Sequence, residues 1–278
     1  MTPTAGSGRD TMMKKHIDIS IAEVSDAYAG AVGTLWEMVM GEEIHIGGTT
    51  ATRELAVLAG ITKDDRVLDI CSALGGPARH LAAEFGCRVT GIDATPAMVD
   101  EAARRTAPAG LDGRVTFRLG NALDLPFRGS SFDTVWGQDA WCYVTDKARL
   151  IREAARVTKA GGTIAFTDWI QLRDVPDQNL DPLLSFMLFP YLETPEGYQR
   201  LLEDNGWEVT AADDLSGDFA EQFTMYRTMI RRELRPEIIR QFGESFFSAV
   251  EDGITLWEHA AHEGIVGRGR WVARKTGT

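Results

Sequence analysis

The sequence predicts an α/β fold, in which a mostly parallel sheet carries helices on both faces. Two observations lead to this prediction. Strand-like apolar segments alternate with helical patterns along most of the 278 residues, as in doubly wound sheets. In addition, an apolar segment containing Asp69 runs through a turn of small residues, 72–76, into a helix, and the next strand ends on Asp93. Units of this kind bind a nucleotide at the helix N-terminus.

Each element has its own signal. Thr95 and Pro96 are typical of a helix N-cap and first turn. A later apolar stripe at positions 150, 151, 154 and 157 predicts a second helix, which Gly161 and Gly162 end. Strands are expected, in chain order, at residues 66–70, 88–92, 115–119, 134–137, 163–167, 207–211 and 270–273.

Two segments do not belong to the minimal sheet. Residues 19–60 read as two helices joined at GEEIHIGG, and residues 218–264 read as a helical insertion broken at Pro236. Such additions usually cover the ligand crevice at the carboxyl ends of the strands, so the substrate pocket is expected there, together with residues 183–191. The expected division is a disordered tail (1–16), an N-terminal helical cap (17–60), a core (61–217 and 265–278) and a helical lid (218–264).

Composition limits the partners. A net charge of -12 argues against a nucleic-acid or anionic membrane surface, and the absence of a run of about 18 apolar residues argues against membrane spanning. The three cysteines share no spacing typical of disulfide frameworks or zinc sites. We therefore expect a cytoplasmic protein with a small-molecule partner, and the oligomeric state stays open.

The nucleotide is indicated by the turn. Asp93 lies 18 residues after Gly75, where a carboxylate can accept both hydroxyls of a ribose. The glycine spacing of dinucleotide sites is absent, and alternate positions carry Cys71, Ala73 and Gly75. With Asp69, this turn resembles the D-x-G-x-G-x-G of class I S-adenosylmethionine-dependent methyltransferases. The later order of motifs supports the resemblance over roughly residues 45–278.

The resemblance implies a Rossmann-like seven-stranded sheet whose last strand, at 270–273, is antiparallel, and it implies S-adenosyl-L-methionine as cofactor. Asn121 stands where the family commonly has Asp, and its amide oxygen can still accept a hydrogen bond from adenine. Met98 faces either the adenine or the core, and Cys71 is interpreted as a small apolar residue. The expected cofactor contacts are Asp69, Cys71, Ala73, Gly75, Asp93, Ala94, Met98, Asn121, Ala122 and Gln138.

The segment around the fourth strand indicates the chemical class of the methyl acceptor. Its WGQDAWCYV resembles the W-x-Q-D-A of the glycine, sarcosine and dimethylglycine N-methyltransferases, and GEEIHIG resembles their G-E-D-I-H-x-G. Phosphoethanolamine N-methyltransferases are similar too. In these families a His stands at the place of Tyr143, and the Tyr of T-D-Y is Trp169 here. Residues 186–191 are uncharged, which disfavours a phosphate-bearing acceptor.

Catalysis needs an unprotonated acceptor. His45, Asp139 and Tyr143 are the candidates to take or relay its proton, although Asp139 could equally bind the cofactor's amino group or the substrate cation. His259 and His262 lack a third ligand, so no metal is expected. The aromatic residues expected around a methylated cation are Trp36, Trp141, Trp169, Phe189 and Tyr191.

The first functional hypothesis is therefore methyl transfer to the nitrogen of an amino acid or amine. The second keeps the cofactor and changes the acceptor to a thiol, another soft nucleophile or a carbon centre. The third is a non-catalytic cofactor-binding protein, which the altered glycine turn favours. Fold resemblance alone does not identify an acceptor.

Overall fold

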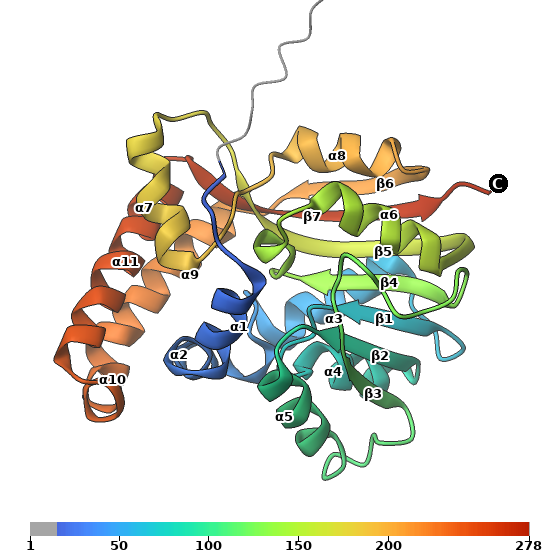
Figure 1. Ribbon diagram of the computed structural model, residues 1–278, viewed down its shortest axis with the longest axis horizontal. Coiled ribbons are helices and arrows are strands. Elements are labelled where there is room, and N and C mark those ends of the chain that lie inside the picture. The colour runs from blue at the N-terminus through green and yellow to red at the C-terminus, as the bar shows by residue number, and fades with distance from the viewer. Residues whose placement is uncertain (1–15, 278) are drawn as a thin grey trace, which may run out of the picture.

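One seven-stranded sheet forms the centre of the protein. The computed structural model describes residues 16–277 and places the strands in the order β3-β2-β1-β4-β5-β7-β6 (Figure 1). The strands are β1 (Arg66–Ile70), β2 (Arg88–Asp93), β3 (Val115–Leu119), β4 (Phe132–Gln138), β5 (Thr158–Gln171), β6 (Trp207–Asp214) and β7 (Val266–Lys275). Neighbouring strands from β3 to β5 pair in parallel, and β7 is antiparallel to β5 and β6. The predicted sheet and its antiparallel last strand are confirmed.

Two apolar cores cover the two faces of the sheet. On one face, α3 (Gly48–Ala59) and α4 (Gly76–Phe85) pack on side chains that include Val67, Val89 and Ala165. On the other face, α6 (Lys147–Val157) and α8 (Pro195–Glu203) pack on Leu68, Val135 and others. Helix α5 (Pro96–Thr106) lies against β2 and β3. The central strands β1 and β4 are buried along most of their length because helices cover both faces, whereas the edge strands β3 and β6 are largely exposed or half-buried.

The N-terminal segment contains one more helix than predicted. It forms α1 (Ile21–Ala29), α2 (Ala31–Met40), the short 3₁₀ helix η1 (Gly41–Glu43) and then α3. The additional break is at Gly30, and α2 returns so closely past α1 that a Cβ on Gly33 would lie 2.0 Å from the Tyr28 carbonyl oxygen. Two glycines three residues apart therefore allow a tight turn between α1 and α2, which the apolar pattern did not indicate.

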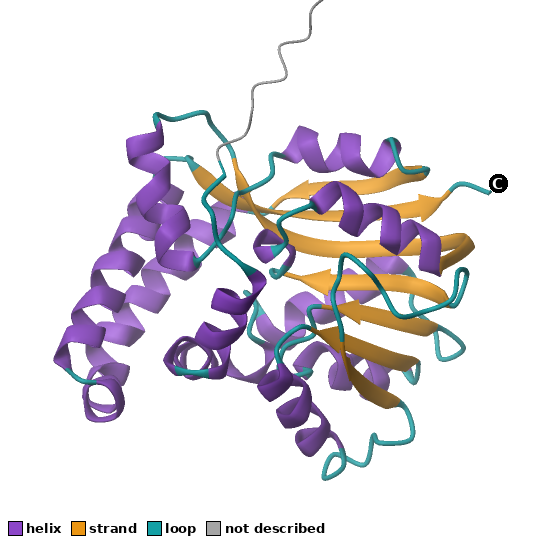
Figure 2. Cartoon of the chain, in the orientation of Figure 1, coloured by secondary structure: helices purple, strands orange, loops and turns teal. Residues whose placement is uncertain are grey.

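The lid helices gather beyond the carboxyl ends of the strands (Figure 2). They are α7 (Asp177–Met187), α9 (Ser216–Met229), a π-helical turn (Ile230–Leu234), α10 (Arg235–Phe242) and α11 (Glu244–His262). The α-helical pattern is interrupted where the break at Pro236 was predicted: the π-helical turn ends at Leu234, and this proline sits in the first turn of the new helix α10, where its missing N–H costs nothing. The chain turns again at Gly243, with φ of 87°. Helix α7 packs on α11, so the group of lid helices includes residues that precede the predicted lid.

Three expectations concern membrane-spanning helices, metal sites and the N-terminal tail. Within residues 16–277, no helix combines the length and apolarity needed to cross a membrane. In the same range, no group of three or more His, Cys, Asp and Glu side chains is placed to hold a metal, and this includes His259 and His262. The disordered tail expected at residues 1–16 lies outside the described residues except for His16.

Candidate active site

A cavity of about 410 Å³ opens at the carboxyl ends of the parallel strands, beneath α1 and η1. Four acidic residues line it, namely Glu43, Asp69, Asp93 and Asp139. None of the described residues lining it is Lys, Arg or His. The location is the crevice at which open α/β sheets bind ligands, and the charge suits a ligand that carries positive charge.

The turn after β1 keeps a glycine-like backbone although two of its positions have side chains. Cys71 has a φ of 63° and Ala73 a φ of 43°, both in the left-handed region, and both line the cavity. This conformation costs an L-residue roughly 1–2 kcal/mol. Burial, and then the charges of Asp93 and Asp69, raise the pKa of the Cys71 thiol well above its ordinary value. The thiol is therefore a small uncharged group, as interpreted from the sequence.

Replacing both residues by glycine tests this strain. Cys71→Gly/Ala73→Gly is expected to raise the free energy of unfolding by about 1 kcal/mol, because strain relief exceeds the entropy that glycine costs, and to leave cofactor affinity unchanged or tighter. Denaturant unfolding and calorimetry measure the two effects. Gly75→Ala is the contrasting variant, because its Cβ would lie 2.3 Å from the Phe117 ring. A clear loss of affinity in the double variant would mean that the cofactor packs against the two side chains.

Asp93 ends β2 and lines the cavity. Its Oδ2 accepts a hydrogen bond from the Ala73 N–H and its Oδ1 from the Thr95 N–H, both at 2.9 Å. Each oxygen keeps a further lone pair for a ligand. Burial raises the pKa of this carboxyl, and the two backbone N–H groups oppose the shift only in part. The carboxylate thus caps the turn, and ribose binding stays a prediction.

Most of the other residues expected to contact the cofactor line the cavity, and Gly75 does not. Ala94, Met98, Ala122 and Gln138 line the cavity, as does Asn121. However, the Asn121 Oδ1 already accepts the Leu123 N–H at 2.8 Å, so the oxygen expected to be available to adenine has only one lone pair left. Gly75 does not line the cavity; it lies at the N-cap of α4, close to Phe117 and Arg79. Its expected cofactor contact is therefore not supported.

Gln138 presents an amide donor to the cavity. The Trp136 indole can only donate, and its Nε1 lies 3.2 Å from the Gln138 Oε1, which identifies that atom as the acceptor. The Thr52 hydroxyl donates to the same oxygen at 3.0 Å. The Nε2 is buried and has no hydrogen-bond partner among residues 16–277. An unpartnered buried donor in a cavity wall indicates a ligand oxygen there.

Asp69, at the edge of the same cavity, has an unpartnered buried Oδ2. Burial, and then the charges of Asp93 and Glu43, raise its pKa to about 8. The carboxyl is therefore largely protonated at neutral pH. A bound cation would favour its ionised form, which fits the ammonium and sulfonium groups of the cofactor expected from the sequence.

The raised pKa of Asp69 predicts a pH-dependent stability. Because the folded state keeps the proton between about pH 4 and pH 8 while the unfolded state loses it, stability falls as pH rises through this window. Asp69→Asn is expected to match the wild type near pH 4 and to exceed it by at least about 1 kcal/mol at pH 8.5. Urea unfolding at both pH values measures this, with the exposed Asp100→Asn as control. Equal stabilities at pH 8.5 would contradict the shift.

A second, much smaller cavity adjoins the first. Its volume of about 10 Å³ holds roughly one water molecule. It shares Tyr28, Ile44, Asp139 and Tyr143 with the large cavity. The remaining lining residues are Trp36, Met40, His45, Trp169 and Phe189. Three of the five aromatic residues expected at the acceptor, Trp36, Trp169 and Phe189, are thus brought together next to the catalytic candidates.

Trp141 and Tyr191 are not in this cavity, so their expected substrate contacts are wrong. Residues Trp141–Tyr143 form a 3₁₀ turn, which turns the Trp141 ring into the core of the sheet, where it stacks on Phe166 at 4.4 Å and its indole N–H donates to the Ile70 carbonyl. The Tyr191 ring packs against the Lys147 ammonium, 3.6 Å from its centroid. The prediction placed Trp141 at the carboxyl edge of the sheet because it follows the fourth strand, and Tyr191 in the segment 183–191 expected at the pocket.

Asp139 is a fully engaged anion. Its Oδ1 accepts from the Thr167 hydroxyl and the Arg268 Nε, both at 2.8 Å, and its Oδ2 accepts from the Ile46 N–H at 2.9 Å. Burial acts to raise the pKa of Asp139, but Arg268 and His45 outweigh it and the pKa lies below its ordinary value. Such a carboxylate is a poor proton acceptor. Arg268 was missed from the sequence because it lies 129 residues away.

His45 and Tyr143 are engaged as well. The His45 ring lies 3.1 Å from the Ile46 carbonyl through Nδ1 and 3.0 Å from the Thr52 hydroxyl through Nε2. The Tyr143 and Tyr28 hydroxyls are 2.6 Å apart, joining α1 to the sheet edge. Burial, and then Tyr28, raise the pKa of Tyr143 well above its ordinary value. The Tyr143 phenol therefore stays protonated at neutral pH and lines the cavity as a hydrogen-bonding aromatic side chain.

Comparisons with known proteins identify the type of enzyme. Residues 68–166 match the methyltransferase domain family. The sarcosine/dimethylglycine N-methyltransferase of Halorhodospira halochloris is 27% identical over 251 residues, which are 84% of this chain and 88% of that protein. The 27-O-demethylrifamycin SV methyltransferase of Amycolatopsis mediterranei is 33% identical over 170 residues, 57% of this chain and 61% of that protein. The chain is a class I S-adenosylmethionine-dependent methyltransferase.

A solved structure supports the fold of this methyltransferase. The Haemonchus contortus phosphoethanolamine N-methyltransferase 2, in complex with phosphomonomethylethanolamine and S-adenosylhomocysteine, superimposes with a TM-score of 0.84 at 22% identity. The match covers 93% of this chain and 61% of that chain. This likeness shows the fold, and the cofactor contacts expected from the turn remain predictions.

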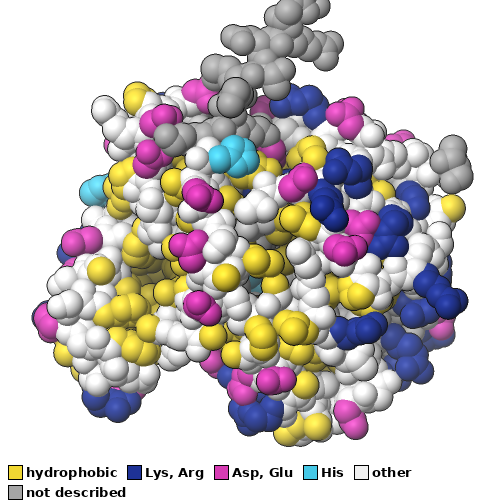
Figure 3. Space-filling model, in the orientation of Figure 1, with side chains coloured by type: hydrophobic (Ala, Val, Ile, Leu, Met, Phe, Trp, Pro, Cys, Tyr) yellow, Lys and Arg dark blue, Asp and Glu magenta, His cyan; other side chains and the backbone are white. Residues whose placement is uncertain are grey.

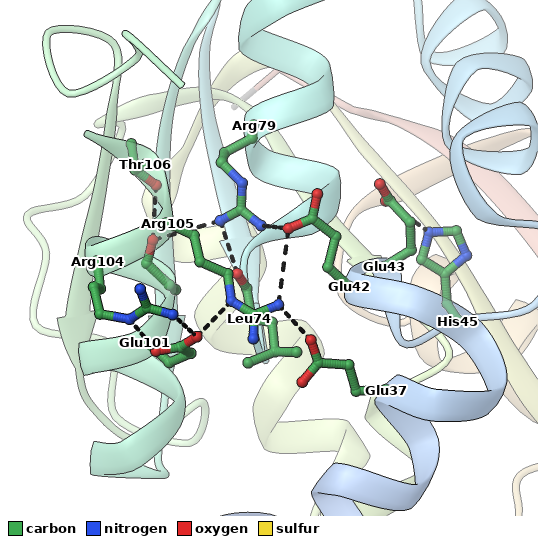
Figure 4. A network of polar contacts seen from close by, with 11 residues as sticks. Glu37, Glu42, Glu43, His45, Leu74, Arg79, Glu101, Arg104, Arg105 and Thr106 are labelled. Carbon is green, nitrogen blue, oxygen red and sulfur yellow. Dashed lines mark hydrogen bonds and ion pairs between the residues drawn. The ribbon is translucent and has the colours of Figure 1, made fainter. Parts of the chain in front are cut away.

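An ionic network joins the N-terminal helices of the methyltransferase to α4 and α5 (Figure 4). The Arg79 guanidinium, on α4, lies 2.6 Å from the Glu42 carboxylate of η1 and also donates to the Leu74 carbonyl at 2.8 Å. Arg105, on α5, lies 2.6 Å from both Glu37 and Glu101. Arg79 thus joins the cofactor turn to the helical cap, a role that the sequence pattern did not indicate.

Proposed function

We propose that this methyltransferase transfers a methyl group to the nitrogen of a small amine or amino acid. The observation that carries the proposal is the aromatic cavity, which meets the acidic cofactor cavity at Asp139 and Tyr143. Aromatic faces attract a methylated ammonium by roughly 0.5–2 kcal/mol. The relative from Halorhodospira, which acts on sarcosine and dimethylglycine by name, supports the same acceptor class.

S-adenosylmethionine supplies an electrophilic methyl group on a sulfonium. The chain would hold it through Asp93 at the ribose, Met98 near the adenine and Asp69 at the methionine end. The aromatic cavity would exclude water and align the acceptor lone pair with the methyl. Positioning of this kind is worth effective molarities on the order of 10⁵ M or more.

The lining disfavours a phosphate-bearing acceptor. Among the described residues that line the two cavities there is no Lys or Arg. The smaller cavity is lined by Phe189, which belongs to the uncharged segment 186–191. A phosphate would therefore lack cationic partners. A small molecule, rather than a nucleic acid or a membrane, is the proposed partner, and the cytoplasm is the proposed compartment.

One observation favours a second candidate. Hydrophobic side chains line a hollow between the lid lobe and the N-terminal helices (Figure 3). The small aromatic cavity has room for about one water molecule, so an acceptor must displace some of its lining side chains, and an apolar body would suit the hollow. The alternative is therefore methyl transfer to the sulfur or carbon of an apolar small molecule.

An acceptor screen decides between the two. Release of S-adenosylhomocysteine is followed with amino acids and amines of increasing methylation, with thiols and with carbon acids. The proposal expects turnover with amines at least about tenfold above every thiol and carbon acid. Turnover confined to thiols or carbon acids would replace the proposal by the alternative.

A further inference from the structure

The three residues expected to take a proton from the acceptor are all engaged. Both ring nitrogens of His45 have hydrogen-bond partners. Asp139 accepts three hydrogen bonds and pairs with Arg268. The Tyr143 hydroxyl shares a hydrogen bond with Tyr28, and ionising it is disfavoured by burial. An amine acceptor that arrives as an ammonium ion therefore needs another base.

Glu43 is the carboxylate with an available oxygen where the two cavities meet. Glu43 lines the cofactor cavity, Ile44 lines both cavities and His45 lines the aromatic one. The Glu43 Oε2 is buried without a hydrogen-bond partner, 3.5 Å from the His45 Nε2. Figure 4 shows Glu42 turned toward Arg79 and Glu43 turned toward His45. The sequence analysis did not single out this residue.

The backbone holds Glu43 in this position. Ile44 has a φ of 47°, and a β-branched residue in the left-handed region is strained. On one side of it, Glu42 is paired with Arg79 at 2.6 Å, and on the other, the Ile46 N–H donates to Asp139. Both anchors keep the strained turn in place. Strain that neighbouring contacts maintain is typical of functional sites.

We propose that Glu43 is the base that removes a proton from the acceptor ammonium, an inference that rests on the proposed N-methylation. Glu43 takes one proton from R–NH₃⁺ and leaves R–NH₂. The nitrogen lone pair then forms the N–C bond while the C–S bond breaks and its electron pair stays on sulfur. The product leaves as R–NH₂–CH₃⁺, and Glu43 releases its proton to water. One proton is released per turnover.

The test compares Glu43→Gln with the wild type on two acceptors found by the screen. With a strongly basic amine at pH 7, kcat should fall at least about a hundredfold. The residual rate should rise about tenfold per pH unit between pH 7 and 9, because the fraction of neutral amine rises by that factor, whereas the wild-type rate stays nearly flat. With a weakly basic amine that is already neutral at pH 7, the variant should stay within about threefold of the wild type.

Other ionisable groups surround Glu43, so the pH profile needs a control. They are His45 beside it, Asp69 and Asp93 at the strand ends, Asp139 with Arg268, and the Tyr28–Tyr143 pair. Glu54→Gln, an exposed carboxylate on α3 that pairs with Arg270, should keep the wild-type profile. Calorimetry with S-adenosylhomocysteine should give the same Kd for all three proteins.

Three results would overturn the assignment. These are a normal rate of Glu43→Gln with the strongly basic amine, an equal loss with the weakly basic amine, and a loss accounted for by weaker cofactor binding. In each case the wild type still methylates amines, so the proposed function survives. A wild type that methylates no amine would remove both proposals together.

Discussion

Replacing Asp139 by alanine is expected to lower the free energy of unfolding by about 3–5 kcal/mol, because the Arg268 guanidinium would remain buried without its partner. Both side chains of this pair are only 2% exposed, and they meet at 2.8 Å. Turnover should also fall at least about a hundredfold, because the Ile46 N–H loses its acceptor and the segment carrying Glu43 and His45 shifts. Urea unfolding and S-adenosylhomocysteine release measure the two effects.

The surface pair Asp213–Arg270 provides a matched control, since Arg270 lies two residues beyond Arg268 on β7. Asp213 is 42% exposed, and Asp213→Ala should cost less than about 1 kcal/mol. The double variant Asp139→Ala/Arg268→Leu should recover much of the stability, because no buried charge remains, while its turnover stays low. A single variant as stable as the wild type would show that Arg268 finds another partner.

The pH dependence of the same variant follows from the pKa of Asp139, which lies below its ordinary value. A carboxyl of this kind contributes stability above its unfolded pKa of about 3.9 and loses it as pH falls through the folded value. The difference between wild type and Asp139→Ala should therefore be full at pH 6 and shrink below about pH 4.

Asp93→Ala is expected to weaken cofactor binding at least about tenfold, because two ribose hydroxyl contacts of roughly 0.5–1.5 kcal/mol each would be lost. The turn would also lose the acceptor of the Ala73 and Thr95 N–H groups. Calorimetry with S-adenosylmethionine and S-adenosylhomocysteine gives the two affinities. Asp100→Ala, exposed on α5, is the control and should bind normally.

A double-mutant cycle separates the ribose contact from the turn. An S-adenosylhomocysteine analogue that lacks one ribose hydroxyl should bind the wild type more weakly than the parent compound. This penalty should vanish in Asp93→Ala, because the partner of the missing hydroxyl has gone. An equal loss of affinity in both proteins would place the ribose away from Asp93. The carboxylate would then serve only as the hydrogen-bond acceptor of the turn.

The elements near the cofactor were predictable because local patterns determine them. The β1 strand, the small-residue turn and the start of α4 follow one another along the chain, and Asp93 ends the next strand. Parallel neighbours in a sheet end at the same edge, so the position of Asp93 beside the turn follows from topology. Even so, the left-handed conformation of Cys71 and Ala73 was not evident, because neither residue type favours it.

The sequence indicated only some of the aromatic residues that line the small cavity. Trp36, Trp169 and Phe189 come from three separate segments and meet in one cavity, whereas Trp141 and Tyr191, which have the same aromatic character, do not. The difference arises at the 3₁₀ turn Trp141–Tyr143, which reverses the alternation of a strand and sends Trp141 into the core. No periodic pattern predicts where a strand stops.

The sequence by itself determined the fold and indicated the cofactor, since these depend on the order of strands and on residues adjacent in the chain. Only the tertiary structure decided which polar atoms are free to act. Arg268 pairs with Asp139, and Thr52 and Ile46 lie at hydrogen-bond distance from the ring nitrogens of His45. Among the described residues, Glu43 keeps one oxygen without a hydrogen-bond partner, 3.5 Å from the His45 Nε2. The physical reason is that hydrogen bonding and burial decide the reactivity of a side chain, and both depend on partners that folding brings from distant parts of the chain.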